Sequence, residues 1–262
     1  MTGTRVTGLL PRFLLRIAKG AFFALILTME ASGQDRSLNA HAADRQALLD
    51  DLARITRETR SETGRGALSE RVMEALRRVP RHRLVPQAEQ GSAYRNAPLA
   101  IGLGQTISQP FIVALMTDLL DVKAGDRVLE VGTGSGYQAA VLAELGAKVY
   151  TIEILEPLAR EAAARLAELG YKSIVTRVGD GYRGWPEHAP FDSIIVTAAA
   201  REVPAPLVEQ LKPGGKLVIP VGESGGAQTL WLIEKQADGK TARRQILAVR
   251  FVPLTGEGQK PR

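Results

Sequence analysis

The stretch Val128-Leu-Glu-Val-Gly-Thr-Gly-Ser-Gly-Tyr137 decides the fold of this chain. An apolar strand, Arg127–Val131, runs into a turn with three glycines and then into a helix that should reach Leu145. Glycine lets a backbone approach a ligand where any side chain would clash. In open α/β sheets, ligands bind at the carboxyl ends of the strands. We therefore predict a parallel α/β sheet with a ligand site at this turn.

Strands and helices alternate downstream of the turn. Further strands are expected at Lys148–Ile152, Ile174–Val178, Phe191–Val196 and Lys216–Pro220. Helices should lie between them, one over Pro157–Leu169 and one that ends near Lys212-Pro-Gly-Gly215. Apolar strands separated by helices are typical of a parallel sheet covered on both faces.

The C-terminal end of the chain has a different pattern. Thr229–Glu234 and Gln245–Val252 look like two strands joined by the turn Ala237-Asp-Gly-Lys240, with no helix between them. The predicted fold class is therefore α/β, a doubly wound and mostly parallel sheet with an antiparallel strand pair at the C-terminal end.

The region before the glycine turn has a helical pattern. Apolar residues recur at helical spacing between residues 40 and 90, and Pro80 should end the second of two helices. Residues 91–110 are rich in glycine and proline and indicate a structured loop. Pro110 then opens a helix to Leu120, because proline is tolerated at the first helical position.

Residues 1–33 have the layout of a secretory signal peptide. Basic residues precede an apolar run, Ala21–Met29, and small residues follow it. The run is too short for a comfortable membrane span. The alternatives are a misassigned start codon or an amphipathic extension. We expect an extension at 1–33, a helical substrate-side region at 40–120 and a cofactor-binding sheet at 121–262, the last two in one domain, 34–262.

Composition excludes several kinds of chemistry. The net charge is +6 and cysteine is absent, which removes disulfides, Cys-ligated zinc, iron–sulfur clusters and a thiol nucleophile. No lysine or arginine run is interleaved with aromatic residues, so a nucleic-acid partner is not expected. No convincing set of carboxylates converges either, and we expect no metal.

The glycine spacing and nearby acids indicate the cofactor. Dinucleotide enzymes prefer G-x-G-x-x-G, whereas this turn is G-x-G-x-G. Glu130 would repel a pyrophosphate but would favour the cationic end of S-adenosylmethionine. Glu153 can accept from both ribose hydroxyls, and Asp180 from the adenine amine. The expected cofactor site, for S-adenosylmethionine and its product S-adenosylhomocysteine, is Glu130, Gly132, Thr133, Gly134, Ser135, Gly136, Glu153, Asp180 and Gly181.

Each acid also has a simpler alternative role. Glu130 could cap nearby backbone amides, and Glu153 could be a solvated acid at a strand end. Asp180 could form the turn before Gly181.

Missing motifs narrow the methyl acceptor. The Asn/Asp-Pro-Pro-Tyr motif of amine methylation would follow the fourth strand, where this chain has Val196-Thr-Ala-Ala-Ala200. Pyrimidine-carbon methylation usually needs a cysteine nucleophile. A carboxylate is already ionised at neutral pH and mainly has to be held in line with the methyl group, which is catalysis by positioning.

Ser108, in Gly104-Gln-Thr-Ile-Ser-Gln-Pro110, is the candidate catalytic residue. Its hydroxyl, with free backbone amides of the helix that starts at Pro110, could bind a carboxylate. The expected substrate-binding residues are Thr106, Ile107, Ser108 and Gln109. The alternative is that Ser108 only caps the helix.

Motifs in order over roughly residues 65–255 resemble the protein-L-isoaspartate O-methyltransferases. The substrate-side motifs are Ala93-Tyr94, Pro98-Leu99, Ile101-Gly102 and Gly104–Pro110. The others are Leu129–Gln138, Gly179-Asp-Gly181, Gly184-Trp185-Pro186, Thr197–Ala200, Leu211–Gly215 and Val249–Pro253. The resemblance is specific, because the motif before the sheet is restricted to this family.

The resemblance implies a Rossmann-like class I methyltransferase acting on the misplaced α-carboxylate of L-isoaspartyl residues in damaged proteins. It places Ser108 at the substrate. At the cofactor it places Glu130, Gly132, Gly134, Glu153, Asp180 and Gly181. Isoaspartyl proteins and peptides would be the partners of a cytoplasmic monomer, with membrane contact only through residues 1–33. A small-molecule or RNA methyltransferase, or an inactive cofactor-binding module, is the alternative. Of these interpretations, only the isoaspartyl methyltransferase requires an intact Gln105–Pro110 motif, which this sequence has.

Overall fold

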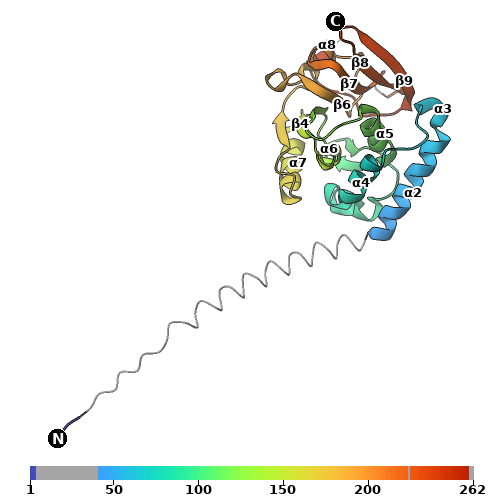
Figure 1. Cartoon of the computed structure of the whole chain (residues 1–262). Helices are drawn as coiled ribbons and strands as arrows, with labels where there is room; N and C mark the ends of the chain where they lie inside the picture. Colours follow the sequence, from blue (N-terminus) through green and yellow to red (C-terminus); the bar gives the residue numbers. More distant parts are fainter. Residues whose placement is uncertain (4–40, 224, 260–262) are drawn as a thin grey trace. The chain divides into compact units, whose positions relative to one another are not determined.

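The computed structural model describes residues 1–3, 41–223 and 225–259 (Figure 1). They belong to two units, Met1–Ala43 and Asp44–Arg262, and the second unit contains the sheet. Residues 4–33, on which the prediction of export or anchoring depends, lie outside the described residues, so it stays a prediction. No helix in the described ranges is long and apolar enough to cross a membrane.

A seven-stranded sheet forms the centre of the second unit, in the order β5-β4-β3-β6-β7-β8-β9. Its strands are β3 (Arg127–Val131), β4 (Lys148–Glu153), β5 (Val175–Val178), β6 (Phe191–Val196), β7 (Leu211–Val221), β8 (Gln228–Lys235) and β9 (Thr241–Val249). Strands β3 to β7 are parallel, whereas β8 and β9 join antiparallel, which confirms the predicted fold class. From β3 the chain first adds β4 and β5 on one side of β3, and then adds β6 and β7 on its other side. Ligands bind outside the strand ends at such a switch point.

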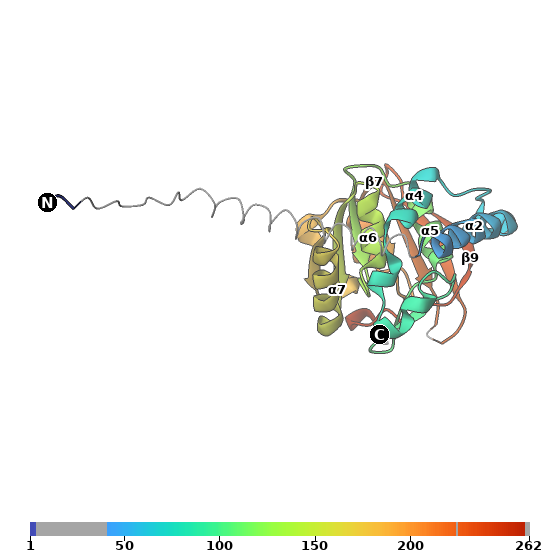
Figure 2. The ribbon, with the colours of Figure 1, turned by 90° about the horizontal axis from the view of Figure 1, so that it is seen from below.

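Helices and short turns cover the two faces of the sheet. Successive strand residues point to opposite faces, so Val128 belongs to one core cluster and Leu129 to the other. The first face is covered by α4 (Glu70–Arg78), α5 (Pro110–Leu120), α6 (Tyr137–Glu144) and α7 (Glu156–Glu168) (Figure 2). The second is covered by α8 (Ala205–Glu209) and the 3-10 turns η3 (Gly181–Arg183) and η4 (Pro186–His188). The other elements are α2 (Ala42–Glu58), α3 (Arg60–Thr63), η1 (Arg81–Leu84), η2 (Gln87–Ser92) and η5 (Glu257–Gln259).

Residues 91–110 differ from the expected loop. They contain a hairpin, β1 (Leu99–Gly102) and β2 (Gln105–Ile107), paired antiparallel as a separate sheet. Its strands are too short to show an alternating pattern in the sequence. Pro110 does begin a helix that ends at Leu120, and every residue of this helix is buried.

Two strand boundaries were predicted wrongly. Strand β7 starts at Leu211 rather than Lys216, because Leu211 already pairs with Phe191. An irregular register then absorbs the Lys-Pro-Gly-Gly residues that resembled a helix end. Strand β9 covers Thr241–Val249 rather than Gln245–Val252, because polar residues 241–244 pair with β8 at the sheet edge. The remaining strands of the sheet begin and end within one residue of the prediction.

Candidate active site

A cavity of about 940 Å³, counted with its open mouth, lies at the carboxyl end of β3. It brings the glycine turn next to the substrate-side segment, as the sequence predicts. From the cofactor prediction it is lined by Glu130, Gly132, Thr133, Gly134, Ser135, Glu153 and Gly181, and from the substrate prediction by Thr106, Ile107 and Ser108. Gly136, Asp180 and Gln109 do not line it.

The glycine turn needs glycine at Gly132. Its φ is +100°, and a Cβ built there would lie 2.5 Å from Oγ1 of Thr197. That hydroxyl donates to the Gly132 carbonyl at 2.7 Å, so it is fixed in place. Gly136 has a different task, because a Cβ there would press on Leu166 of α7 at 3.0 Å. Gly132 therefore shapes the cavity floor, while Gly136 lets α6 and α7 pack.

Glu153, the last residue of β4, fixes the glycine turn by hydrogen bonds to backbone amides. Its Oε2 accepts from the amide of Gly134 at 2.9 Å and its Oε1 from the amide of Leu155 at 3.1 Å. The side chain is buried and lines the cavity. The carboxylate therefore is not the solvated strand-end acid of the alternative interpretation.

Glu130 is a buried acid with unused hydrogen-bonding capacity. It is completely inaccessible to solvent, and neither carboxylate oxygen has a hydrogen-bond partner among the described residues. The Thr151 hydroxyl is instead 2.6 Å from that of Thr133. The pKa of Glu130 is raised to about 8, chiefly by burial and also by the charge of the Glu153 carboxylate, and the nearby polar groups of Thr151 and Ala139 only moderate this rise. A cation bound beside Glu130 would favour its ionised form, so the acid and a cationic ligand would stabilise each other.

The segment around Ser108 departs from the prediction in one respect. The N-cap of α5 is Gln109, without a side-chain cap bond, and the Ser108 hydroxyl makes no hydrogen bond among the described residues. Ser108 is therefore not a helix cap. The helix-start amides, however, are not free. The Phe111 amide donates to Oδ1 of Asn96 at 3.0 Å, and those of Ile112 and Val113 donate to the Gln109 carbonyl.

The comparisons with known proteins agree with this geometry. A family described as Protein-L-isoaspartate(D-aspartate) O-methyltransferase matches residues 57–259. The chain belongs to the protein-L-isoaspartate O-methyltransferase family. A relative from Polaromonas sp. (strain JS666), named Protein-L-isoaspartate O-methyltransferase 2, is 59% identical over 80% of this chain and 100% of its own length.

Other relatives support the assignment to the isoaspartate O-methyltransferase family. Protein-L-isoaspartate O-methyltransferase 1 of Cupriavidus necator is 54% identical over 94% of both chains. That alignment covers 247 residues, more than residues 34–262 contain, so it includes part of the N-terminal segment. A Plasmodium falciparum family member, solved with S-adenosyl-L-homocysteine, superposes with a TM-score of 0.66 at 27% identity, over 80% of this chain and 98% of its own.

In the chain described here, Asp180 lies outside the main cavity. Its Oδ1 accepts from the Tyr182 amide at 2.9 Å and its Oδ2 from the Glu257 amide at 2.8 Å. It lines a neighbouring groove with Arg177 and Arg183. The structure therefore confirms the turn-forming role, and contact with adenine stays a prediction. Gly181 does line the cavity, and a Cβ there would lie 2.3 Å from Cγ1 of Val131.

Several residues that line the cavity were not predicted from the sequence. Leu103, at the hairpin tip with φ +52° and 61% exposed, lines the cavity mouth. Thr197 lies against Gly132, and residues 252–255 close the remaining wall. Pro253 reaches this wall by a bridge to Ala199. The family motifs around Thr197 and Pro253 were the available signal, but no spacing rule connects them to the glycine turn.

Glu130 predicts how the stability of the ligand-free protein depends on pH. Its pKa is about 8 in the folded chain and near 4.5 when unfolded, so between these values the folded state holds a proton that the unfolded state has lost. The free energy of unfolding should therefore fall as pH rises from about 4.5 to 8 and level off above this. Urea unfolding of Glu130→Gln should show a flatter profile in this window. Parallel profiles for the two proteins would contradict the assignment.

Proposed function

We propose that this protein transfers a methyl group from S-adenosylmethionine to the free α-carboxylate of L-isoaspartyl residues in damaged proteins and peptides, which initiates their repair. One observation carries the proposal. Ser108 lines both the cavity at the glycine turn and a second groove, together with Thr106, Thr197 and Val252. An acceptor carboxylate at Ser108 can thus face a methyl donor in the cavity while the rest of a peptide lies in the groove.

The cavity residues fit S-adenosylmethionine. The unpartnered carboxylate of Glu130 suits its cationic end, and Gly132 provides a surface that a Cβ would fill. Glu153 is the proposed acceptor for the ribose hydroxyls and Asp180 for the adenine amine. When bound, the cofactor supplies an electrophilic methyl group. Among the described residues, no cluster of three metal-binding side chains occurs.

Ser108 orients the acceptor and does not need to form a covalent bond. A carboxylate is ionised at neutral pH, so no base has to remove a proton. The Ser108 hydroxyl is free to donate to one carboxylate oxygen. The amides at the start of α5 were expected to help orient the acceptor carboxylate, but they are occupied. The Ser108 hydroxyl therefore orients this carboxylate without them.

Methyl transfer to matched peptides tests the proposal. The wild-type protein should methylate an isoaspartyl peptide and disfavour the same peptide with normal aspartate. In the normal residue the carboxylate lies about a bond length too far, and a misplacement of about 1 Å can cost about a hundredfold in rate. Equal labelling of both peptides would overturn the substrate assignment. Labelling of neither would favour an inactive module, and labelling of RNA or small metabolites would favour the other alternative.

Replacement of Ser108 by alanine tests its role. Turnover on the isoaspartyl peptide should fall by about tenfold or more, since a hydrogen bond to a charged group contributes roughly 1.5–3 kcal/mol. Binding of S-adenosylhomocysteine, measured by calorimetry, should not change. Ser173→Ala, at an exposed position outside the cavity and groove, is the matched control. An unaltered rate in Ser108→Ala would remove this residue from the mechanism.

The monomeric state and the cytoplasmic location stay predictions. The cytosolic cofactor proposed here supports the cytoplasmic location. Fractionation of cells and sequencing of the mature N-terminus would decide whether residues 1–33 direct export.

A further inference from the structure

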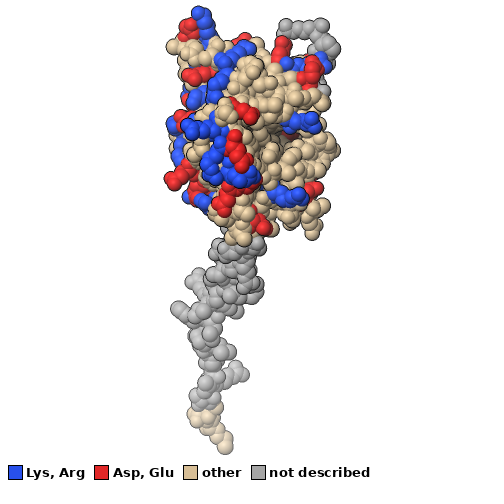
Figure 3. Space-filling model, turned by 90° about the vertical axis from the view of Figure 1, so that its right-hand side faces the viewer, with Lys and Arg blue, Asp and Glu red and all other residues tan. Residues whose placement is uncertain are grey.

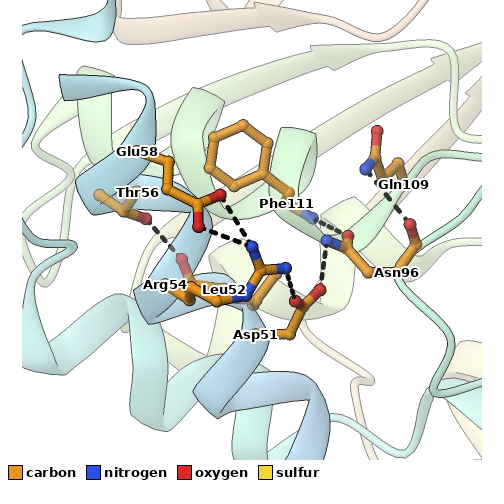
Figure 4. Close-up of polar contacts among 8 residues, drawn as sticks. All are labelled: Asp51, Leu52, Arg54, Thr56, Glu58, Asn96, Gln109 and Phe111. Atoms are coloured by element: carbon orange, nitrogen blue, oxygen red, sulfur yellow. Dashed lines mark hydrogen bonds and ion pairs between the residues drawn. The ribbon is translucent and has the colours of Figure 1, made fainter. Parts of the chain in front are cut away.

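Asn96 ties together both ends of the segment that presents Ser108. Its Oδ1 accepts from the Phe111 amide at 3.0 Å, and its backbone carbonyl accepts from Nε2 of Gln109 at 3.2 Å (Figure 4). Along the chain, Asn96 is followed by the β1–β2 hairpin, then by Ser108, and then by the two residues that contact Asn96. Asn96 therefore closes residues 96–111 into a loop and holds Gln109 and Phe111, the first and third residues after Ser108.

A carboxylate on α2 fixes the orientation of this amide. Nδ2 of Asn96 donates to Oδ2 of Asp51 at 2.9 Å (Figure 4). The other oxygen, Oδ1 of Asp51, pairs with Arg54, which also binds Glu58 at 2.8 Å. The two partners of the Asn96 side chain fix which end is oxygen and which is nitrogen. The Phe111 amide can only donate, so it faces Oδ1, and the Asp51 carboxylate can only accept, so it faces Nδ2. The side chain of Asn96 therefore cannot flip without loss of both bonds.

The bonds of Asp51 differ from the other ion pairs on the same surface. The face in Figure 3, the right-hand side of Figure 1 where α2 lies, carries basic and acidic side chains close together. Most such pairs join exposed side chains, as Arg54 and Glu58 do on α2. Exposed pairs contribute little to stability. Asp51, by contrast, is only 32% exposed and connects α2 to the loop that carries Ser108.

We infer that Asn96 is a positioning residue of the substrate site and that Asp51 holds its side chain in the active orientation. Through this pair, α2 sets the place of Ser108 relative to the glycine turn, although neither Asn96 nor Asp51 lines the cavity. The inference rests on the proposed function, because one of its readouts is methyl transfer to an isoaspartyl peptide.

The single variants should separate positioning from cofactor binding. In Asn96→Asp, one oxygen can still accept from the Phe111 amide, but the other faces the Asp51 carboxylate, and like charges repel. A shift of Ser108 by about 1 Å would lower kcat by about a hundredfold, and we expect a loss between tenfold and that value. The Kd of S-adenosylhomocysteine should stay within about twofold, because neither Asn96 nor Asp51 lines the cavity.

Exchange of the two side chains should restore activity. In the double variant Asp51→Asn with Asn96→Asp, the new amide can turn its oxygen to Arg54 and its nitrogen to the new carboxylate. The bond between residues 51 and 96 is then remade with donor and acceptor reversed, and the Phe111 amide and Arg54 still donate to an oxygen of the new side chains. We expect kcat to return to within about threefold of the wild type, a coupling expected of residues in direct contact. Asp50→Asn, the neighbouring residue on α2 with the same loss of charge, is the matched control and should behave as the wild type.

Two readouts keep the inference separate from the proposed function. Hydrogen exchange of the Phe111 amide, followed by NMR, should accelerate in Asn96→Ala and return to the slow rate in the double exchange variant. If the wild type lacks activity, the proposed function fails, and the exchange rates still test whether Asn96 and Asp51 hold this segment. A wild-type kcat in Asn96→Asp, or a double variant that recovers melting temperature without kcat, would reduce Asn96 to a structural cap.

Discussion

Gly132→Ala is expected to lower the affinity for S-adenosylhomocysteine by about a thousandfold. The residue has φ +100°, and the new Cβ would lie 2.5 Å from Oγ1 of Thr197. Backbone strain of this kind costs roughly 1–3 kcal/mol and overpacking a similar amount. The midpoints of these two costs sum to about 4 kcal/mol, which at about 1.4 kcal/mol per tenfold is a loss of affinity of about three orders of magnitude. The turn can avoid this cost only by moving, which would change the cavity floor.

Two control variants separate strain from contact. Gly170→Ala places an alanine at φ +90° with no atom within 4 Å of the new Cβ, so it measures the backbone cost alone. It should lower the melting temperature slightly and leave binding unchanged. Thr197→Ala added to Gly132→Ala removes the hydroxyl and should recover part of the affinity. Normal calorimetric binding and stability in Gly132→Ala would show that the contact with Thr197 is not restrictive.

Glu153→Ala should weaken S-adenosylhomocysteine binding by about a hundredfold or more. The change removes the proposed acceptor for the ribose hydroxyls, and it also frees the amides of Gly134 and Leu155. Hydrogen bonds to a charged group contribute roughly 1.5–3 kcal/mol each, so loss of even one corresponds to about ten- to a hundredfold. The released turn adds to this loss. Isothermal calorimetry measures the effect directly.

The contribution of the ribose contact can be separated from that of the turn. Glu153→Gln keeps one oxygen for either the Gly134 amide or the ribose, so we expect an intermediate affinity. Glu156→Ala is the matched control, since that exposed acid three residues further on forms an ion pair with Arg160 on α7. Unchanged binding in Glu153→Ala would show that the ribose assignment is wrong.

The sequence alone determined the part of the site that is continuous in the chain. Strand β3, the glycine turn and the start of α6 follow within a dozen residues, so propensity, apolar runs and glycine spacing are sufficient. The same holds for the helix that Pro110 begins, because φ of proline and the apolar run are local properties. Glu130, Glu153 and Ser108 could be named as candidates because they lie within or next to these local patterns.

Tertiary structure alone decided which partners these residues find. The Phe111 amide is occupied by Asn96, fifteen positions away, and Asn96 is held by Asp51, forty-five positions away. Asp180 likewise binds the amide of Glu257 across seventy-seven positions. Spacing rules describe neighbours along a helix or strand, and they contain no term for contacts between segments that packing brings together. The sequence therefore predicted where the site lies, and packing determined which of its polar groups remain free to act.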